Sequence, residues 1–127
     1  MATERPAAPR RSVLRWAGAG LASLVLIGGL ATAAFAIERV RATDDNVFRP
    51  RRVTVSVGER VVWRSTSSRT HTVTAYRGGW SKNTTLVEGE RTSFTFSDRG
   101  RFRYRCMFHS TLSDGRCSGM CGVVVVG

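Results

Sequence analysis

The sequence is poor in the residues on which most metal and acid–base sites depend. Its 127 residues contain two histidines, three cysteines and three prolines, and lysine occurs once, at Lys82. Two histidines exclude a trinuclear copper cluster or a three-histidine zinc site within this single chain. Acidic residues are also scarce, since nine Asp and Glu stand against twenty Lys and Arg, for a formal net charge of +11. Neither a second metal site nor an acid–base pair can be assembled, so we do not expect an enzyme.

Helical periodicity is also missing after residue 37, and short segments of alternating apolar and polar residues take its place. Such alternation is typical of strands that bury one face. We expect strands in residues 37–42, 53–57, 61–63, 71–75, 94–96, 102–106 and 123–126. Turn sequences such as Asp98-Arg99-Gly100 lie between them. The pattern predicts one all-β domain, an antiparallel β-sandwich or barrel.

Three stretches between the expected strands have no clear alternation. They are a polar loop at residues 65–70, a connection at 77–90 that is long enough to hold a short helix, and a loop at 110–119. We find no internal repeat and no second domain, in keeping with the length of the chain.

The first 36 residues have the organisation of an export signal. Residues 1–15 are basic, residues 17–37 carry no charge, and Ala34-Phe35-Ala36 forms a small-x-small cleavage site. The pair Arg10-Arg11, with two apolar residues after a one-residue spacer, is typical of twin-arginine export. The alternative is a retained membrane anchor, because the 21 uncharged residues are long enough to span a bilayer of about 30 Å.

Both alternatives divide the chain into a signal or anchor at residues 1–36 and a domain at residues 37–127. We expect this domain outside the cytoplasm, in the periplasm or on the outer face of the cell membrane, with membrane association through residues 17–37 if the signal is retained. Without the first 36 residues the net charge falls from +11 to +8.

The strongest chemical signal is the sequence Cys106-x-x-His109, followed by Met120 just before the last apolar run. His71 begins an expected strand far upstream. His71 and Cys106 each share the parity of the apolar residues in their own strands, so both side chains should face inward. One thiolate, two imidazoles and a weak axial thioether describe a type 1, or blue, copper site for electron transfer. Thiolate and thioether favour Cu(I) while imidazoles tolerate Cu(II), and a rigid β scaffold need move little between the two states.

At these residues the chain resembles the cupredoxin family, in particular the small plastocyanin-like copper proteins of bacteria. The resemblance covers most of residues 46–127. Its motifs are Phe48-x-Pro50, Val57-Gly58, Val61-Val62-Trp63, His71-Thr72-Val73-Thr74 and Tyr104-x-Cys106-x-x-His109. It implies a Greek-key β-sandwich that holds one copper near one end and carries electrons. Carried over by position, it implies the metal ligands His71, Cys106, His109 and Met120.

The chain departs from the family pattern at two places. The interval between His109 and Met120 is much longer than the few residues usual in the family, so residues 110–119 form an insertion. Ser65 stands where the family often has an asparagine after the tryptophan strand, so a hydrogen bond that supports the ligand loop is expected to differ.

Cys117 and Cys121 flank Met120. In an exported protein, two cysteines outside a metal site are most simply a disulfide, which would stiffen the inserted loop. The alternative is that one of these thiols is a second copper ligand, as in a site that stores or delivers Cu(I).

The distribution of basic residues indicates which kinds of partner the protein would bind. Arg101, Arg103 and Arg105 should form a cationic stripe on the outer face of the strand that leads to Cys106, and residues 49–52 hold a second arginine cluster. The stripe would attract an acidic redox partner or an anionic membrane surface. The alternative is an ordinary solvated face in a chain biased towards arginine. No aromatic interleaving or basic helix is present, so we expect no nucleic-acid binding.

The sequence therefore predicts an exported, monomeric carrier of single electrons with one mononuclear copper. His109 would be nearer to solvent than His71 and would serve as the electron port, with Phe108 and Leu112 in the surrounding docking surface. The alternative is an extracytoplasmic copper chaperone or storage protein that binds Cu(I) without a role in electron transfer.

Overall fold

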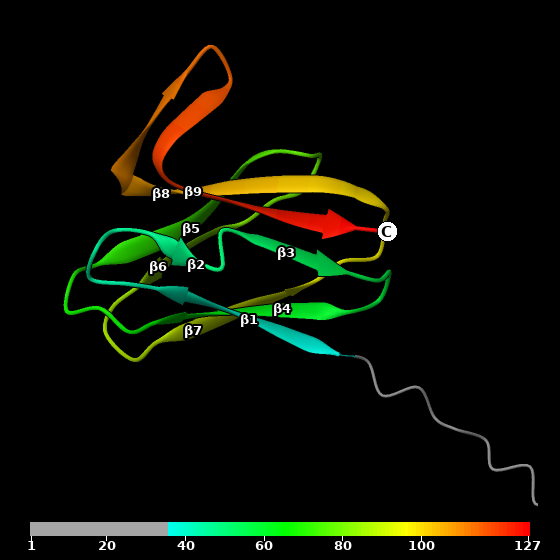
Figure 1. The fold of residues 1–127 in the computed structure, drawn as a ribbon, viewed down its shortest axis with the longest axis horizontal. Coiled ribbons are helices and arrows are strands. Elements are labelled where there is room, and N and C mark those ends of the chain that lie inside the picture. Colours follow the sequence, from blue (N-terminus) through cyan, green and yellow to red (C-terminus); the bar gives the residue numbers. More distant parts are fainter. Residues whose placement is uncertain (1–35) are drawn as a thin grey trace, which may run out of the picture. The chain divides into compact units, whose positions relative to one another are not determined.

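The computed structural model describes residues 36–127, which fold as two β-sheets packed face to face (Figure 1). The predicted signal or anchor at residues 1–36 lies, except for its last residue, outside the described residues. Within residues 36–127 no helix is long and apolar enough to cross a membrane.

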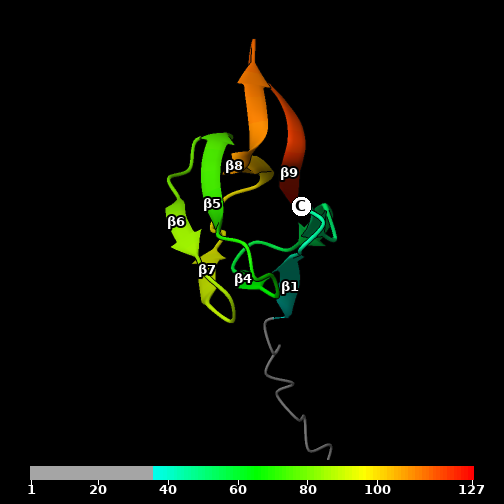
Figure 2. The same cartoon turned by 90° about the vertical axis from the view of Figure 1, so that its left-hand side faces the viewer.

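The described residues form nine strands. They are β1 (Ile37–Ala42), β2 (Phe48–Arg49), β3 (Arg52–Val55), β4 (Arg60–Ser65), β5 (His71–Arg77), β6 (Asn83–Leu86), β7 (Arg91–Thr95), β8 (Gly100–Ser113) and β9 (Arg116–Val126). One sheet has the order β2-β1-β4-β7 and the other the order β3-β9-β8-β5-β6. Figure 2 shows β1, β4 and β7 in one layer and β5, β8 and β9 in the other.

The predicted all-β sandwich is confirmed, but its sheets are mixed rather than purely antiparallel. Strand β1 runs parallel to β4, and β3 runs parallel to β9. The remaining pairs are antiparallel. Alternation in the sequence shows which side chains face inward but carries no information on the direction of the neighbouring strand. In each parallel pair, the chain passes through the other sheet after the first strand and then returns to form the second.

The core lies between the two sheets and is aromatic at its centre. Tyr104 packs edge-on against both Trp63 and Phe48, with ring centroids 5.3 Å and 4.8 Å apart. All three side chains are fully buried. Tyr104 is only two residues from Cys106 in β8, so this close packing restricts the motion of the segment that carries Cys106.

The connection at residues 77–90 contains a strand and not the short helix that its length allowed. Strand β6 pairs with β5 from Asn83 to Leu86, and Leu86 is buried. Threonines at positions 84 and 85 favour a strand at the sheet edge over a helix.

The sequence predicted a loop at residues 110–119, and this prediction is wrong. The insertion instead extends β8 and β9 into a hairpin. The pairing continues from Ser110 opposite Gly119 to Ser113 opposite Arg116. Asp114 and Gly115 form the tip, both with positive φ (50° and 71°), as a tight hairpin turn requires. The hairpin stands out from the sandwich in both views (Figures 1 and 2).

Gly122 lets β9 pass the ring of Tyr104. A Cβ atom at residue 122 would lie 2.3 Å from Cζ of Tyr104 and 2.4 Å from its hydroxyl oxygen. Because Tyr104 is fully buried, a side chain at residue 122 would force the packed ring or the strand to shift.

We therefore expect Gly122→Ala to lower the free energy of unfolding by about 1–3 kcal/mol, measured by denaturant titration of the metal-free protein. The matched control is Gly127→Ala, since nothing lies within 4 Å of a Cβ at that position. Equal stability of the two variants would show that the contact with Tyr104 does not constrain the fold.

Candidate metal centre

Three side chains converge at one end of the sandwich. His71 is the first residue of β5, and Cys106 and His109 belong to β8. The Nδ1 atom of His71 lies 3.2 Å from Nδ1 of His109 and 3.8 Å from Sγ of Cys106, which is itself 3.5 Å from Nδ1 of His109. The structure therefore brings together three of the four residues that the sequence predicted, with their ligand atoms facing one another.

The size of this triangle fits a metal ion. A point equidistant from its three corners lies about 2 Å from each of them, close to typical metal–nitrogen and metal–sulfur distances of about 2.0–2.3 Å. His71 and Cys106 are fully buried and His109 is half-buried. The predicted inward orientation of the first two, and the greater exposure of His109, are confirmed.

A wide bulge in β8 creates the centre. Arg105 pairs with Cys121 and Ser110 pairs with Gly119, so the four residues Cys106 to His109 lie opposite the single residue Met120. The extra residues turn the chain so that Cys106 and His109 face the same point. Gly119, with φ of 93°, allows the close approach, because a Cβ there would lie 2.5 Å from the carbonyl oxygen of His109.

Met120 is fully buried in β9, directly across from this bulge. Met107 is the only other methionine in the described residues. Its parity in β8 is opposite to that of Cys106, and its side chain is 49% exposed. Met120 is therefore the methionine of the described residues whose thioether is buried, in the position opposite the ligand segment.

Thr72 links β5 to the ligand segment of β8. Its backbone N–H donates to Sγ of Cys106 over 3.3 Å, and its hydroxyl oxygen accepts from the backbone N–H of Met107 over 2.9 Å. Thr72 is itself buried. These two bonds orient the thiol and hold the start of the bulge. Among residues 36–127, the hydroxyl of Ser65, for which an altered hydrogen bond was expected, forms hydrogen bonds only with Ser67.

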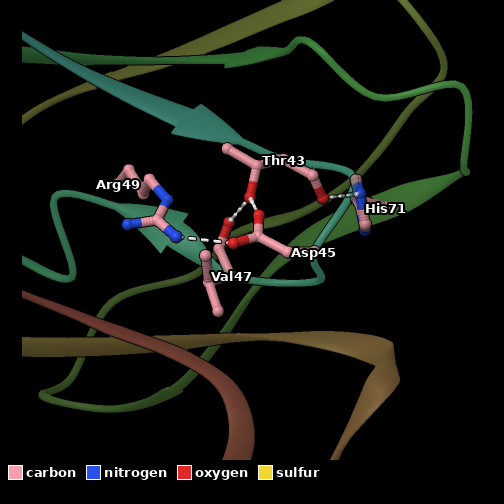
Figure 3. Close-up of polar contacts among 5 residues, drawn as sticks. All are labelled: Thr43, Asp45, Val47, Arg49 and His71. Atoms are coloured by element: carbon pink, nitrogen blue, oxygen red, sulfur yellow. Dashed lines mark hydrogen bonds and ion pairs between the residues drawn. The ribbon is translucent and has the colours of Figure 1, made fainter.

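The turn after β1 orients the imidazole of His71. The Nε2 atom lies 3.0 Å from the backbone carbonyl of Thr43, as the dashed line in Figure 3 shows. An Nε2–H that donates to this carbonyl leaves Nδ1 unprotonated and turned towards Cys106. The Thr43 hydroxyl also contacts Asp45, and the Asp45 carboxylate pairs with Arg49 (Figure 3).

Burial lowers the pKa of His71, and repulsion between its imidazolium and that of His109 lowers it further. A lowered pKa favours the neutral imidazole at neutral pH. The neutral ring is the form that binds a metal.

Cys117 and Cys121 form a disulfide within the β8–β9 hairpin, with an S–S distance of 2.02 Å. The predicted disulfide is thus confirmed, and Cys106 is the free cysteine of the described residues. Neither sulfur of the disulfide is available as a thiolate ligand.

Sequence reasoning missed Thr43 and Thr72, which orient the predicted ligands. Thr72 had one available signal, because it is a polar residue directly after a candidate ligand in a strand. Thr43 had none, since its contribution is a backbone carbonyl.

The comparisons with known proteins agree with this geometry. The family model for copper-binding proteins of the plastocyanin/azurin family matches residues 36–127. A search of curated protein sequences returns no significant match.

Three solved structures have a similar fold. A purple cupredoxin from Nitrosopumilus maritimus gives a TM-score of 0.59 at 20% identity, covering 71% of this chain and 99% of that one. A point mutant of amicyanin in its reduced Cu(I) form gives 0.58 at 23% identity, covering 76% and 88%. A copper-containing nitrite reductase from Thermus scotoductus gives 0.57 at 20% identity, covering 72% of this chain and 22% of that one. At such low sequence identities, the similarity to these three structures shows the fold alone.

We expect Thr72→Val to destabilise the metal-free protein by about 1–3 kcal/mol, because the backbone N–H of Met107 loses its acceptor. Thr95→Val, on the exposed face of β7, is the matched control and should leave stability unchanged. Denaturant titration of both variants measures the difference. A Thr72→Val protein as stable as the control would show that this bond does not hold the bulge.

A thiol titration tests the disulfide. The unfolded, metal-free protein should show one reactive thiol before reduction and three after it. Three reactive thiols before reduction would contradict the Cys117–Cys121 bond.

Proposed function

This chain belongs to the plastocyanin/azurin family of copper-binding proteins, and we propose that it carries single electrons through one copper ion bound by His71, Cys106, His109 and Met120. The observation that supports this proposal most strongly is the triangle of one sulfur and two imidazole nitrogens. Two histidines and one cysteine in a plane, with a weak axial methionine, are the donor set of a type 1 copper centre.

Each of the four side chains would have a different role in binding the copper ion. When bound, the copper supplies a Cu(II)/Cu(I) couple that accepts and returns one electron. Cys106 would provide a thiolate ligand and His71 and His109 two imidazole ligands, and the thioether of Met120 would tune the reduction potential. The bonds from Thr72 and to Thr43 hold Cys106 and His71 in place. Ligands held in this way need not rearrange when the charge of the centre changes.

The half-buried edge of His109 is the proposed electron port. Beside it in β8, Met107 and Phe108 are 49% and 61% exposed, and Leu112 in the hairpin is 40% exposed. A redox partner that covers this apolar surface would exclude water and come close to the imidazole.

The partner that we propose is acidic. Arg101, Arg103 and Arg105 alternate with the buried residues Phe102 and Tyr104 of β8. Their side chains therefore share the outer face of the strand that leads to Cys106. Positive charge along this strand would steer an acidic partner towards the port.

We propose that the protein is exported and works outside the cytoplasm. This part of the proposal is supported by the sequence of residues 1–36, in which basic residues precede an uncharged segment and a small-x-small site.

The protein is proposed to be a carrier and not an enzyme. The nitrite reductase that shares its fold is matched over only 22% of its own length. The metal-ligand cluster found in residues 36–127 is the His71–Cys106–His109 group. A copper-storage or chaperone role is less favoured, because the disulfide removes the two thiols that a second Cu(I) site would use.

The optical spectrum tests the proposal. Protein loaded with Cu(II) should be intensely blue or green, and Cys106→Ser should lose this absorption because the thiolate is gone. Met107→Leu is the matched control, since Met107 is exposed and should not be a ligand. A colourless protein that binds only Cu(I) would contradict the carrier role and favour a chaperone.

The reduction potential tests the axial ligand. Met120→Leu should keep the colour and change the potential, whereas Met107→Leu should leave the potential where it was. Equal potentials for both variants and the unaltered protein would show that Met120 is not a ligand.

A further inference from the structure

The outer face of the β2-β1-β4-β7 sheet carries a row of arginines that crosses all four strands. In the strand register Arg49 lies beside Arg41, Arg41 beside Arg64, and Arg64 beside Arg91. All four are exposed, while their sequence neighbours Ala42 and Trp63 are buried in the core. Since adjacent strands are about 4.8 Å apart, the row is about 14 Å long.

This row is part of a larger basic surface. Arg39 and Arg60 lie on the same outer face, on β1 and β4, and are exposed. A shallow groove over the face is lined by six arginines and by no acidic residue; the arginines are Arg39, Arg41, Arg49, Arg51, Arg64 and Arg91.

Three of the four arginines in the row have no ion pair within residues 36–127. Arg49–Asp45 is the one ion pair found in residues 36–127. The Thr43 hydroxyl and the Arg49 guanidinium lower the pKa of Asp45 to about 2, so this carboxylate neutralises Arg49 at neutral pH. In residues 36–127 no carboxylate forms an ion pair with Arg41, Arg64 or Arg91. Like charges in directly opposed positions destabilise a sheet, so bound anions would stabilise this one.

We propose that this arginine face docks on the phosphate groups of an anionic membrane. The planar, two-pronged guanidinium group matches the geometry of phosphate oxygens. A row of such groups on a broad sheet face suits a layer of lipid headgroups, where phosphates can move to meet each arginine.

The position of β1 favours a membrane over an acidic protein as the occupant. Strand β1 begins at Ile37, the last residue of the uncharged segment of residues 17–37. The first arginine of the face, Arg39, follows the last residue of that segment by two positions, so a segment retained in the bilayer would keep the start of the arginine face close to the membrane. Ile37 is itself 41% exposed at the start of this face.

Docking through this face leaves the proposed electron port free. His109 and Phe108 belong to β8, in the opposite sheet. Figure 2 shows the β8–β9 hairpin on the side of the sandwich away from β1, β4 and β7. A protein bound in this way would present its metal centre to a partner beside or above the membrane.

The test uses residues 37–127, so that insertion of the uncharged segment does not mask the contribution of the arginines. This unit contains every strand of both sheets and all but one residue of the family match, so we expect it to fold on its own. Sedimentation with vesicles of phosphatidylcholine, with or without phosphatidylglycerol, measures binding at physiological salt.

The variant is the triple change of Arg41, Arg64 and Arg91 to Gln. The matched control is the triple change of Arg52, Arg77 and Arg99 to Gln, which removes the same charge from exposed positions outside the arginine face. We expect binding only to vesicles that contain phosphatidylglycerol. The row variant should lose about a hundredfold in affinity, since each arginine at a membrane surface contributes about a factor of five. The control should lose less than threefold, because charges that face away are screened within about 8 Å.

Several results would overturn the proposal. The first is no binding to anionic vesicles, and the second is an equal loss of vesicle affinity in the two triple variants. The third is tighter binding to polyglutamate than to vesicles. The fourth is binding of inorganic pyrophosphate, measured by calorimetry, that the row variant abolishes. The last two would assign the face to an acidic protein or a soluble anion. Unfolding midpoints of both variants identify any loss that is due to unfolding, and the row variant should be at least as stable as the unaltered protein because like charges are removed.

Discussion

The β-bulge at Cys106–His109, opposite Met120, is the constraint on which the rest of the metal centre depends. Without it, a regular strand would place the side chains of Cys106 and His109 on opposite faces of the sheet, because their positions differ by an odd number. The bulge turns both towards His71, which the neighbouring strand β5 holds at the required depth. Two hydrogen bonds of the buried Thr72 then fix β5 against the ligand segment. Strand pairing thus prepares the ligand triangle before any metal is bound.

Much of this centre could be predicted from local sequence. Parity alone placed His71 and Cys106 inside, because each shares its strand face with apolar residues. The scarcity of histidine also helped, since both histidines of the chain occupy ligand positions. The disulfide followed from the number of cysteines and the export signal.

Features that depend on strand register could not be predicted in this way. The insertion at residues 110–119 contains few apolar residues, so nothing in it indicated that β8 and β9 continue as a hairpin. The parallel pairs, and the alignment of Arg49, Arg41, Arg64 and Arg91, join segments far apart in the chain. Pattern analysis found the arginines at residues 49–52 but not the row to which Arg49 belongs, because the row exists only once β1, β4 and β7 are side by side.

Electron transfer through a prepared centre requires that the ligands are already in place and stay in place when the electron arrives. X-ray absorption at the copper edge of the loaded protein, in its oxidised and reduced forms, measures this most directly. We expect one sulfur and two nitrogen ligands at short distance in both states. A centre without sulfur, or one that loses a nitrogen ligand on reduction, would contradict this expectation.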